Sequence, residues 1–210
     1  MRFLLMVCGI AVFAASLQAG EVIKLPAPQK TGGVDVLKAI DMRASASGAE
    51  FPKGKLSRQD LSTLLWAASG LNRDGNEKWT VPMAMGRPPY TKVYVTDKEG
   101  VYLYDWQNHA LVVVSTDTKA HGSIPMQGFG KTASTNIYMV PDMAQLSESS
   151  NGEEWGALLA GAMSQNIYLA AEAVGVGARL VYSIERERAG EAFGLKDGET
   201  ALFAIILGKK

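Results

Sequence analysis

Few side chains in this sequence could carry chemistry on their own. The only histidines, His109 and His121, lie twelve positions apart with no cysteine to join them into a zinc site, so we expect both on the surface or in turns. Neither a G-x-S-x-G elbow nor a P-loop occurs. Gly175 and Gly177 follow a predicted helix instead of preceding one, which indicates a helix C-cap. The sequence therefore predicts a protein that binds a ligand or leaves the chemistry to a cofactor.

The first nineteen residues have the pattern of a secretory signal peptide. Arg2 supplies a positive charge, an apolar run covers 3–15, and Ala19 offers a small residue for cleavage. An uncleaved anchor or a buried helix is the alternative interpretation of this segment. Cleavage would remove Cys8, the only cysteine, and leave no disulfide. We expect an exported protein, periplasmic or secreted, without stable membrane insertion after cleavage.

Composition indicates one ordinary globular domain. The chain has 210 residues, of which 47% are hydrophobic, with 21 basic and 21 acidic residues. Loss of Arg2 would leave a net charge near −1, so nothing favours nucleic acid or an anionic membrane as partner. We expect an extended lead-in at 20–33, rich in proline and glycine, and a single domain at 34–210.

The elements that must position any site alternate between helices and strands. Ser57 is a good N-cap for a helix that ends at Gly70, and Asn151 could cap a long helix. Further predicted elements are a short helix ending near Met42, strands at 92–96, 101–104, 111–115, 136–140, 179–183 and 200–207, and a short helix at 187–193. This order favours an α+β domain built on one mixed central sheet flanked by helices.

The long predicted helix carries two stripes. One is apolar, and the other consists of small residues, namely Gly156, Ala157, Ala160, Gly161 and Ser164. Small residues let another helix approach closely. The second stripe therefore predicts either packing within the chain or a dimer interface, and the sequence leaves both open.

Several separated segments, most of them between Gly161 and Lys210, resemble the FMN-dependent nitroreductase family. They are 160–171 with its Gln165-Asn166 pair, the Val174–Gly177 turn, Phe193-Gly194-Leu195 and Ile206–Lys209, with weaker likeness at 64–73 and in the hairpin 93–105. The resemblance implies a nitroreductase-like fold of the kind also found in SagB-type oxidoreductases. It also implies a homodimer whose long central helix lies in the interface, with FMN bound there.

The resemblance places the FMN phosphate near the end of the first helix. The family motif Arg-x-Ser-x-Arg or Arg-x-Ser-x-Lys is here Arg43-Ala44-Ser45-Ala46-Ser47, so Arg43 and Ser45 match, and Ser47 replaces a cation. Loss of one charge-assisted hydrogen bond costs about 1.5–3 kcal/mol, which would weaken FMN without excluding it. Lys209 falls where the family places a C-terminal phosphate-binding cation.

Two further segments are implied to face the flavin ring. The family loop Pro-Ser-Ala-x-Asn, which reaches the flavin from the partner subunit, corresponds to Pro82, Met83, Ala84 and Gly86, without the serine and asparagine. Methionine could still pack on the ring. Backbone N–H groups near Tyr182 and Ser183 correspond to the region that faces the flavin N5.

The resemblance thus implies an oxidoreductase in which NAD(P)H or another reductant reduces FMN, and FMN reduces a small organic acceptor such as a nitroaromatic or a quinone. The substitutions at Ser47, Met83 and Gly86 support an alternative, a nitroreductase-fold binding protein that has lost or weakened FMN binding. A third possibility is an oxidase of the kind that matures azoline peptides.

Overall fold

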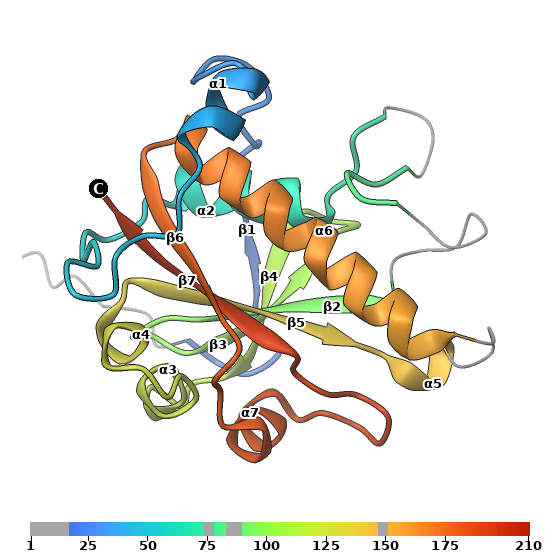
Figure 1. Ribbon diagram of the computed structural model, residues 1–210. Coiled ribbons are helices and arrows are strands. Elements are labelled where there is room, and N and C mark those ends of the chain that lie inside the picture. Colours follow the sequence, from blue (N-terminus) through green and yellow to red (C-terminus); the bar gives the residue numbers. More distant parts are fainter. Residues whose placement is uncertain (1–16, 74–77, 83–89, 147–150) are drawn as a thin grey trace, which may run out of the picture.

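A seven-stranded sheet forms the centre of the computed structural model, which describes residues 17–73, 78–82, 90–146 and 151–210 (Figure 1). The strand order is β1-β4-β3-β2-β5-β7-β6. The strands are β1 Val22–Lys24, β2 Thr91–Thr96, β3 Val101–Asp105, β4 Ala110–Ser115, β5 Thr135–Pro141, β6 Val176–Val181 and β7 Phe203–Lys209. The predicted hairpin is confirmed, because Tyr94 of β2 pairs with Leu103 of β3.

The α+β class is confirmed, but the prediction of a mixed sheet is wrong. Every strand pair in the described residues is antiparallel. The reason lies in the crossover from β5 to β6. β5 and β6 run in the same direction, but they are not neighbours in the sheet. β7 lies between them and pairs antiparallel with both. A parallel pair would need adjacent strands joined by the crossover.

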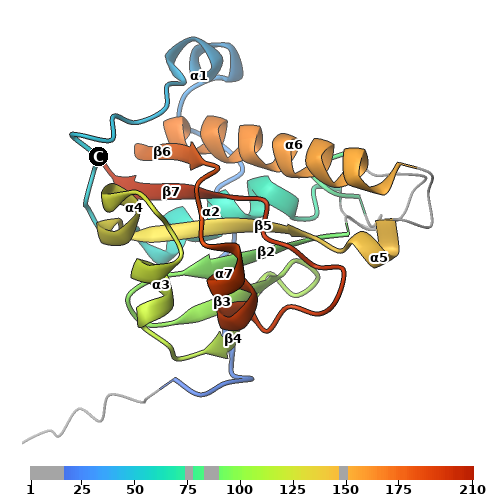
Figure 2. The same ribbon diagram turned by 60° about the horizontal axis from the view of Figure 1, so that its bottom comes forward.

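Helices cover both faces of the sheet. They are α1 Val36–Met42, α2 Arg58–Ser69, α3 Lys119–Ser123, α4 Gly128–Thr132, α5 Met143–Leu146, α6 Gly152–Ala173 and α7 Arg186–Phe193. One apolar core lies under α2 and α6, and a second under α3 and α7. Figure 2 shows α3, α4 and α7 on the side of the sheet opposite α6. No helix in the described segments is long and apolar enough to cross a membrane.

Burial on both faces explains the apolar run near the C-terminus. Ile205 and Leu207 of β7 point into the core under α2 and α6, whereas Ala204 and Ile206 point into the other core. Alternate side chains of a strand point to opposite faces, so a strand covered on both sides is apolar throughout. The prediction of a buried strand here is confirmed.

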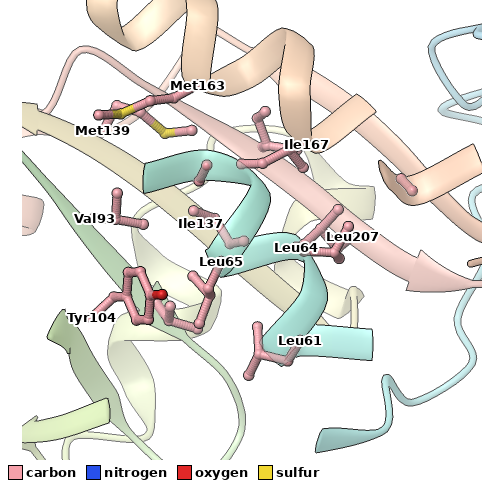
Figure 3. Packing of buried hydrophobic residues seen from close by; sticks show 14 of the residues in the cluster. Leu61, Leu64, Leu65, Val93, Tyr104, Ile137, Met139, Met163, Ile167 and Leu207 are labelled. Atoms are coloured by element: carbon pink, nitrogen blue, oxygen red, sulfur yellow. The ribbon is translucent and has the colours of Figure 1, made fainter. Parts of the chain in front are cut away.

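The two longest helices meet above the sheet. Leu61, Leu64 and Leu65 of α2 belong to the same buried cluster as Met163 and Ile167 of α6, and Figure 3 shows Leu64 beside Leu207 of β7. Full burial of one such side chain contributes about 1.5–3 kcal/mol. The predicted N-cap of α2 is confirmed, because the Ser57 hydroxyl accepts from the Asp60 N–H and the Asp60 carboxylate accepts from the Ser57 N–H. Asn151, in contrast, precedes α6 without a side-chain cap bond.

The small-residue stripe of α6 divides between its two predicted roles. Gly156, Ala160 and Ser164 are buried within the chain, and a Cβ added at Gly156 would lie 3.1 Å from Pro141. Ala157 and Gly161 are exposed instead, and an added Cβ at Gly161 would meet nothing within 4 Å. Packing within the chain therefore accounts for three of the five residues, and the other two stay open at the surface.

The predicted lead-in is partly a strand. Val22–Lys24 joins the sheet as β1, and the following residues pass across α2 as a strap, Leu25–Gln29. Ser62 donates to the Pro26 carbonyl at 2.6 Å, and His109 Nε2 lies 2.7 Å from Ser62 Oγ. His109 has a φ of 46° and sits in a turn, as predicted.

His121 contradicts the prediction of a surface or turn position. It is only 3% exposed, and its Nε2 lies 2.9 Å from the Ala133 carbonyl. Its Nδ1 lies 3.1 Å from the Thr96 hydroxyl, so partners on both ring nitrogens make its burial tolerable. The helix α3 that carries His121 was not predicted, because five residues hold no apolar period.

Candidate functional site

The segment Arg43–Ser47 lies along the free edge of β6. Arg43 ends α1, where its N–H donates to Ala39 O at 2.9 Å. Three residues later, the Ala46 N–H donates to Ala178 O at 2.9 Å, and Arg179 Nη1 donates to Ala46 O at 2.8 Å. The chain therefore fixes this segment through one backbone and one side-chain bond to β6, although its side chains at Ser45 and Ser47 are exposed.

Tyr168 of α6 joins this segment to the strand. Its hydroxyl lies 3.0 Å from Ser45 Oγ and accepts from the Leu180 N–H at 2.7 Å. The Arg43 guanidinium carbon lies 5.4 Å from the centre of the Tyr168 ring, which is the geometry of a cation–π contact. Two predicted site residues, Arg43 and Ser45, thus meet at Tyr168, which is not among the predicted site residues.

The electrostatics of this corner suit an anion. Arg43 is partly buried, and no ion pair among the described residues involves it. The guanidinium therefore keeps its donors for a ligand, and arginine recognises phosphate with paired hydrogen bonds. Ser47 is exposed and adds no charge. The nearby Arg179 is already engaged, since it donates to Ala46 O and lies 5.5 Å from the centre of the Phe129 ring.

Tyr182 and Ser183 follow directly after β6, two and three residues beyond Leu180. Tyr182 is 67% exposed, and the Arg186 guanidinium lies 4.8 Å from its ring centre. The Ser183 carbonyl accepts from the Met126 N–H at 3.2 Å. Met126 is itself 54% exposed, so apolar surface adjoins this stretch of backbone.

Pro82 lies on another side of α6. The Asn166 side-chain amide donates to Ala67 O at 3.0 Å and to Thr80 O at 3.1 Å, and so positions the chain two residues before Pro82. Asn166 and Tyr168 are two residues apart on an α-helix, which turns them about 200° from each other. Within one chain, Pro82 and Arg43 therefore approach α6 from nearly opposite directions. Met83, Ala84 and Gly86 fall outside the described residues.

Lys209 is engaged within the chain. Its Nζ donates to Asp60 Oδ1 at 2.9 Å and to Val174 O at 2.6 Å, at the start of α2 and the end of α6. Burial opposes ionisation of Asp60, but hydrogen bonds from Lys209 and Ser57 outweigh it and lower the pKa of this carboxyl. Lys210 is likewise paired, with Glu172 at 2.8 Å. A role for Lys209 in phosphate binding stays a prediction. In this structure its amine is hydrogen-bonded to Asp60 and Val174.

A cavity of about 530 Å³ lies elsewhere, between the start of α2, the β2–β3 turn and the start of β5. None of the predicted site residues that the structure describes lines it. Lys55 at its rim pairs with Glu99 at 3.1 Å. Among the described residues, no group of histidine, cysteine and acidic side chains could hold a metal ion.

Comparison with known families matches residues 43–209 to the Nitroreductase family. The chain belongs to the nitroreductase family. Among solved structures, it is similar to a protein of Ralstonia eutropha JMP134 assigned as a nitroreductase, with 29% identity, a TM-score of 0.79 and 92% of each chain covered. The family and the nitroreductase fold predicted from the sequence are thus confirmed, and the family supports an oxidoreductase function.

More distant structures share the nitroreductase fold alone. One is a chain of the Escherichia coli microcin synthetase McbBCD complex, with 16% identity, a TM-score of 0.68 and coverage of 100% of this chain and 85% of that one. Another is a protein of Anabaena variabilis assigned as a nitroreductase, with 18% identity, a TM-score of 0.71 and coverage of 90% and 41%. This chain spans less than half the length of the Anabaena protein. Comparison with curated proteins found no match.

Membership in the nitroreductase family makes the corner around Tyr168 the candidate site. The segment that resembles the family's phosphate motif and the backbone that corresponds to its flavin-facing region lie on the same strand edge. The residues predicted from the sequence lie at both ends of this corner, and Tyr168, which lies between them, is not one of them. A signal was available, because Tyr168 is two residues after Asn166 and a buried tyrosine hydroxyl requires partners.

Proposed function

We propose that this chain is an exported FMN-dependent oxidoreductase, which passes electrons from a reduced donor through the flavin to a small organic acceptor such as a nitroaromatic or a quinone. The observation that carries the proposal is the link through Tyr168, which holds Arg43 and Ser45 beside Leu180. This link brings together the predicted phosphate-binding segment at Arg43–Ser47 and the predicted ring-facing segment at Tyr182–Ser183, which are far apart in the sequence.

The residues present fit the phosphate end of FMN. Arg43 offers a guanidinium that pairs with no carboxylate among the described residues, and Ser45 offers a hydroxyl, both at the edge of β6. The exposed stretch Tyr182–Ser183 would hold the ring, with Met126 beside it. Bound FMN would supply the electron transfer, while the protein binds and orients it and excludes water. No side chain need act as an acid, base or nucleophile, in keeping with the scarcity of such groups in the sequence.

A homodimer would complete this site. Pro82 and Arg43 lie on nearly opposite sides of α6, so a ligand that touches both needs Pro82 from a second copy. Apolar side chains are available for the contact, since Val36, Leu37 and Ile40 of α1 are 62%, 75% and 54% exposed and Leu158 of α6 is 52% exposed. We expect a dimer by sedimentation, and we expect Leu158→Glu to shift it toward monomer; a wild-type monomer would contradict the proposal.

The electron donor is proposed to be NAD(P)H or another reductant. Export to the periplasm or the medium would favour a membrane or periplasmic carrier, because nicotinamide coenzymes are scarce outside the cytoplasm. The two donors are distinguished by mixing the flavin-loaded protein anaerobically with NADH or with a reduced low-potential electron carrier and following the loss of flavin absorbance near ~450 nm.

A binding protein that has lost FMN is the alternative, and two observations favour it. Ser47 contributes no charge, and Lys209 is held by Asp60 and Val174. The phosphate end therefore has one cation, Arg43, where the family motif supplies two. An absorbance spectrum of the purified protein, followed by titration with FMN, separates the two functions. A colourless protein that takes up no FMN would exclude the oxidoreductase proposal.

Restoring the missing cation sharpens this test. Ser47→Arg should tighten FMN binding roughly 10- to 100-fold, because one charge-assisted hydrogen bond contributes about 1.5–3 kcal/mol. The matched control is Lys53→Arg, an exposed position in the same loop that keeps its charge. An unchanged affinity in Ser47→Arg would favour a pocket adapted to another ligand.

A further inference from the structure

Tyr168 occupies an unusual place for a buried tyrosine. It is 6% exposed in the core beneath α6, yet its hydroxyl reaches the surface segment at Ser45 and the edge of β6 at Leu180. These are its two hydrogen-bond partners among the described residues. One side chain thus joins three parts of the chain that are distant in sequence.

The Leu180 hydrogen bond has a fixed direction, whereas either hydroxyl could donate between Ser45 and Tyr168, and burial of the Tyr168 proton selects the direction there. The Leu180 N–H can only donate, so the Tyr168 oxygen accepts there. The single proton of Tyr168 then goes to Ser45 Oγ, the remaining described partner, because a buried hydroxyl proton without an acceptor is costly. Ser45 therefore accepts from Tyr168, and its own proton is free to point away from the protein toward a ligand.

The ring of Tyr168 acts on Arg43 as well. The guanidinium lies 5.4 Å from the ring centre, on a side chain that is partly buried and free of ion pairs with the described residues. A stacked guanidinium loses rotational freedom before a ligand arrives. Less entropy is then lost on binding, which is the usual gain from preorganisation.

We propose that Tyr168 is a positioning residue for an anion, which on the proposed function is the phosphate of FMN. It presents the Ser45 proton and holds the Arg43 guanidinium, and so offsets the missing cation at Ser47. Tyr168 does not touch the ligand itself. This inference rests on the proposed flavin function, and its test is designed so that the two can fail separately.

The test compares FMN with riboflavin, which has the same ring without the phosphate. Tyr168→Phe keeps the ring and removes the hydroxyl, so it should weaken FMN about three- to tenfold, the usual range for one neutral hydrogen bond. Riboflavin affinity should not change. Tyr168→Leu removes the ring as well and should weaken FMN further. Tyr102→Phe, another buried tyrosine on β3, is the matched control and should alter neither affinity.

A second variant guards against a purely structural effect. Ser45→Ala leaves the bond between Tyr168 and Leu180 in place, and it should weaken FMN by a similar factor. Tyr168→Phe added to Ser45→Ala should then cost little more, since both act through one hydroxyl chain. If Tyr168→Phe does not fold, a loss of FMN but not riboflavin affinity in Ser45→Ala supports the Ser45 part of the proposal, and equal losses overturn it.

The outcomes are distinct. Wild-type protein that binds neither flavin overturns the proposed function together with this inference. Wild-type protein that binds FMN, with Tyr168→Phe unchanged or with FMN and riboflavin weakened equally, overturns the positioning role alone. Selective loss of FMN affinity in Tyr168→Phe supports it.

Discussion

Lys209→Met offers a sharp test of how the C-terminus is used. The lysine amine bridges the Asp60 carboxylate and the Val174 carbonyl, and so joins the start of α2 to the end of α6. Side-chain exposures are 36% for Lys209 and 13% for Asp60, so the pair is partly screened by water. A hydrogen bond to a charged group contributes about 1.5–3 kcal/mol, and partial exposure reduces this to roughly 1–2 kcal/mol here.

The expected consequence is measurable by thermal and urea unfolding. A loss of 1–2 kcal/mol corresponds to a Tm lower by roughly 2–8 °C for a chain of this size. A double-mutant cycle with Lys209→Met, Asp60→Asn and both together gives the coupling free energy of the pair. This quantity excludes contacts that only one partner makes, such as the capping box between Asp60 and Ser57. Lys53→Met, an exposed lysine, serves as the control and should change Tm very little.

The pH dependence provides a second readout. The pKa of Asp60 in the folded protein lies below its ordinary value of 3.8, so the folded state binds fewer protons than the unfolded state near that pH. The stabilisation that ionised Asp60 provides is therefore complete above pH 3.8 and is lost as the pH falls through the pKa of the folded state. Lys209→Met should reduce this acid sensitivity.

Two results would refute the reasoning on Lys209. A coupling free energy below about 0.3 kcal/mol would show that the pair does not join the helices energetically. A tenfold loss of FMN affinity in Lys209→Met, with riboflavin affinity and Tm unchanged, would instead establish the phosphate-binding role predicted from the sequence.

Three other predictions follow from the packing. Burial lowers the pKa of His109, so stability should fall as pH drops below 6.5, and His109→Asn, which tolerates the positive φ, should remove that dependence in Tm measurements. Asn166→Leu leaves two carbonyls without donors and should cost about 1–3 kcal/mol, with faster amide exchange at Thr80. Gly208→Ala would place Cβ 1.8 Å from a backbone oxygen and should cost about 3 kcal/mol or more in urea unfolding, whereas Gly190→Ala, in open space on α7, should stabilise.

The fold was largely predictable, because its signals are local. A capping residue such as Ser57 and the apolar run at 200–207 determine element type without reference to the rest of the chain. Strand direction is different in kind. Whether β7 pairs parallel or antiparallel depends on which position it takes between β5 and β6, and no local pattern encodes that position. The mixed sheet was predicted from element order, and insertion of β7 made it antiparallel.

The candidate site was predictable at its ends and not at its centre. A family motif predicts Arg43 and Ser45 as site residues. Only the structure shows that Tyr168 links them to Leu180. Tyr168 lies within the segment that resembles the family, but the sequence does not show which groups its hydroxyl meets. Lys209 is the opposite case, because the sequence gives no sign of the partner that its amine has in the structure, Asp60. Its role in phosphate binding stays a prediction.

In this chain, one helix, α6, positions two separate segments. Asn166 positions the chain that leads to Pro82, while Tyr168 positions Arg43 and Ser45 on nearly the opposite side. A change in the rotation of α6 would therefore displace both groups at once. If two copies assemble along the exposed face at Gly161, the phosphate end of each site would be set by one α6 and its ring end by the other. Substitution at Gly161 by a large residue should then reduce FMN affinity and dimerisation together, although Gly161 itself contacts neither Arg43 nor Pro82.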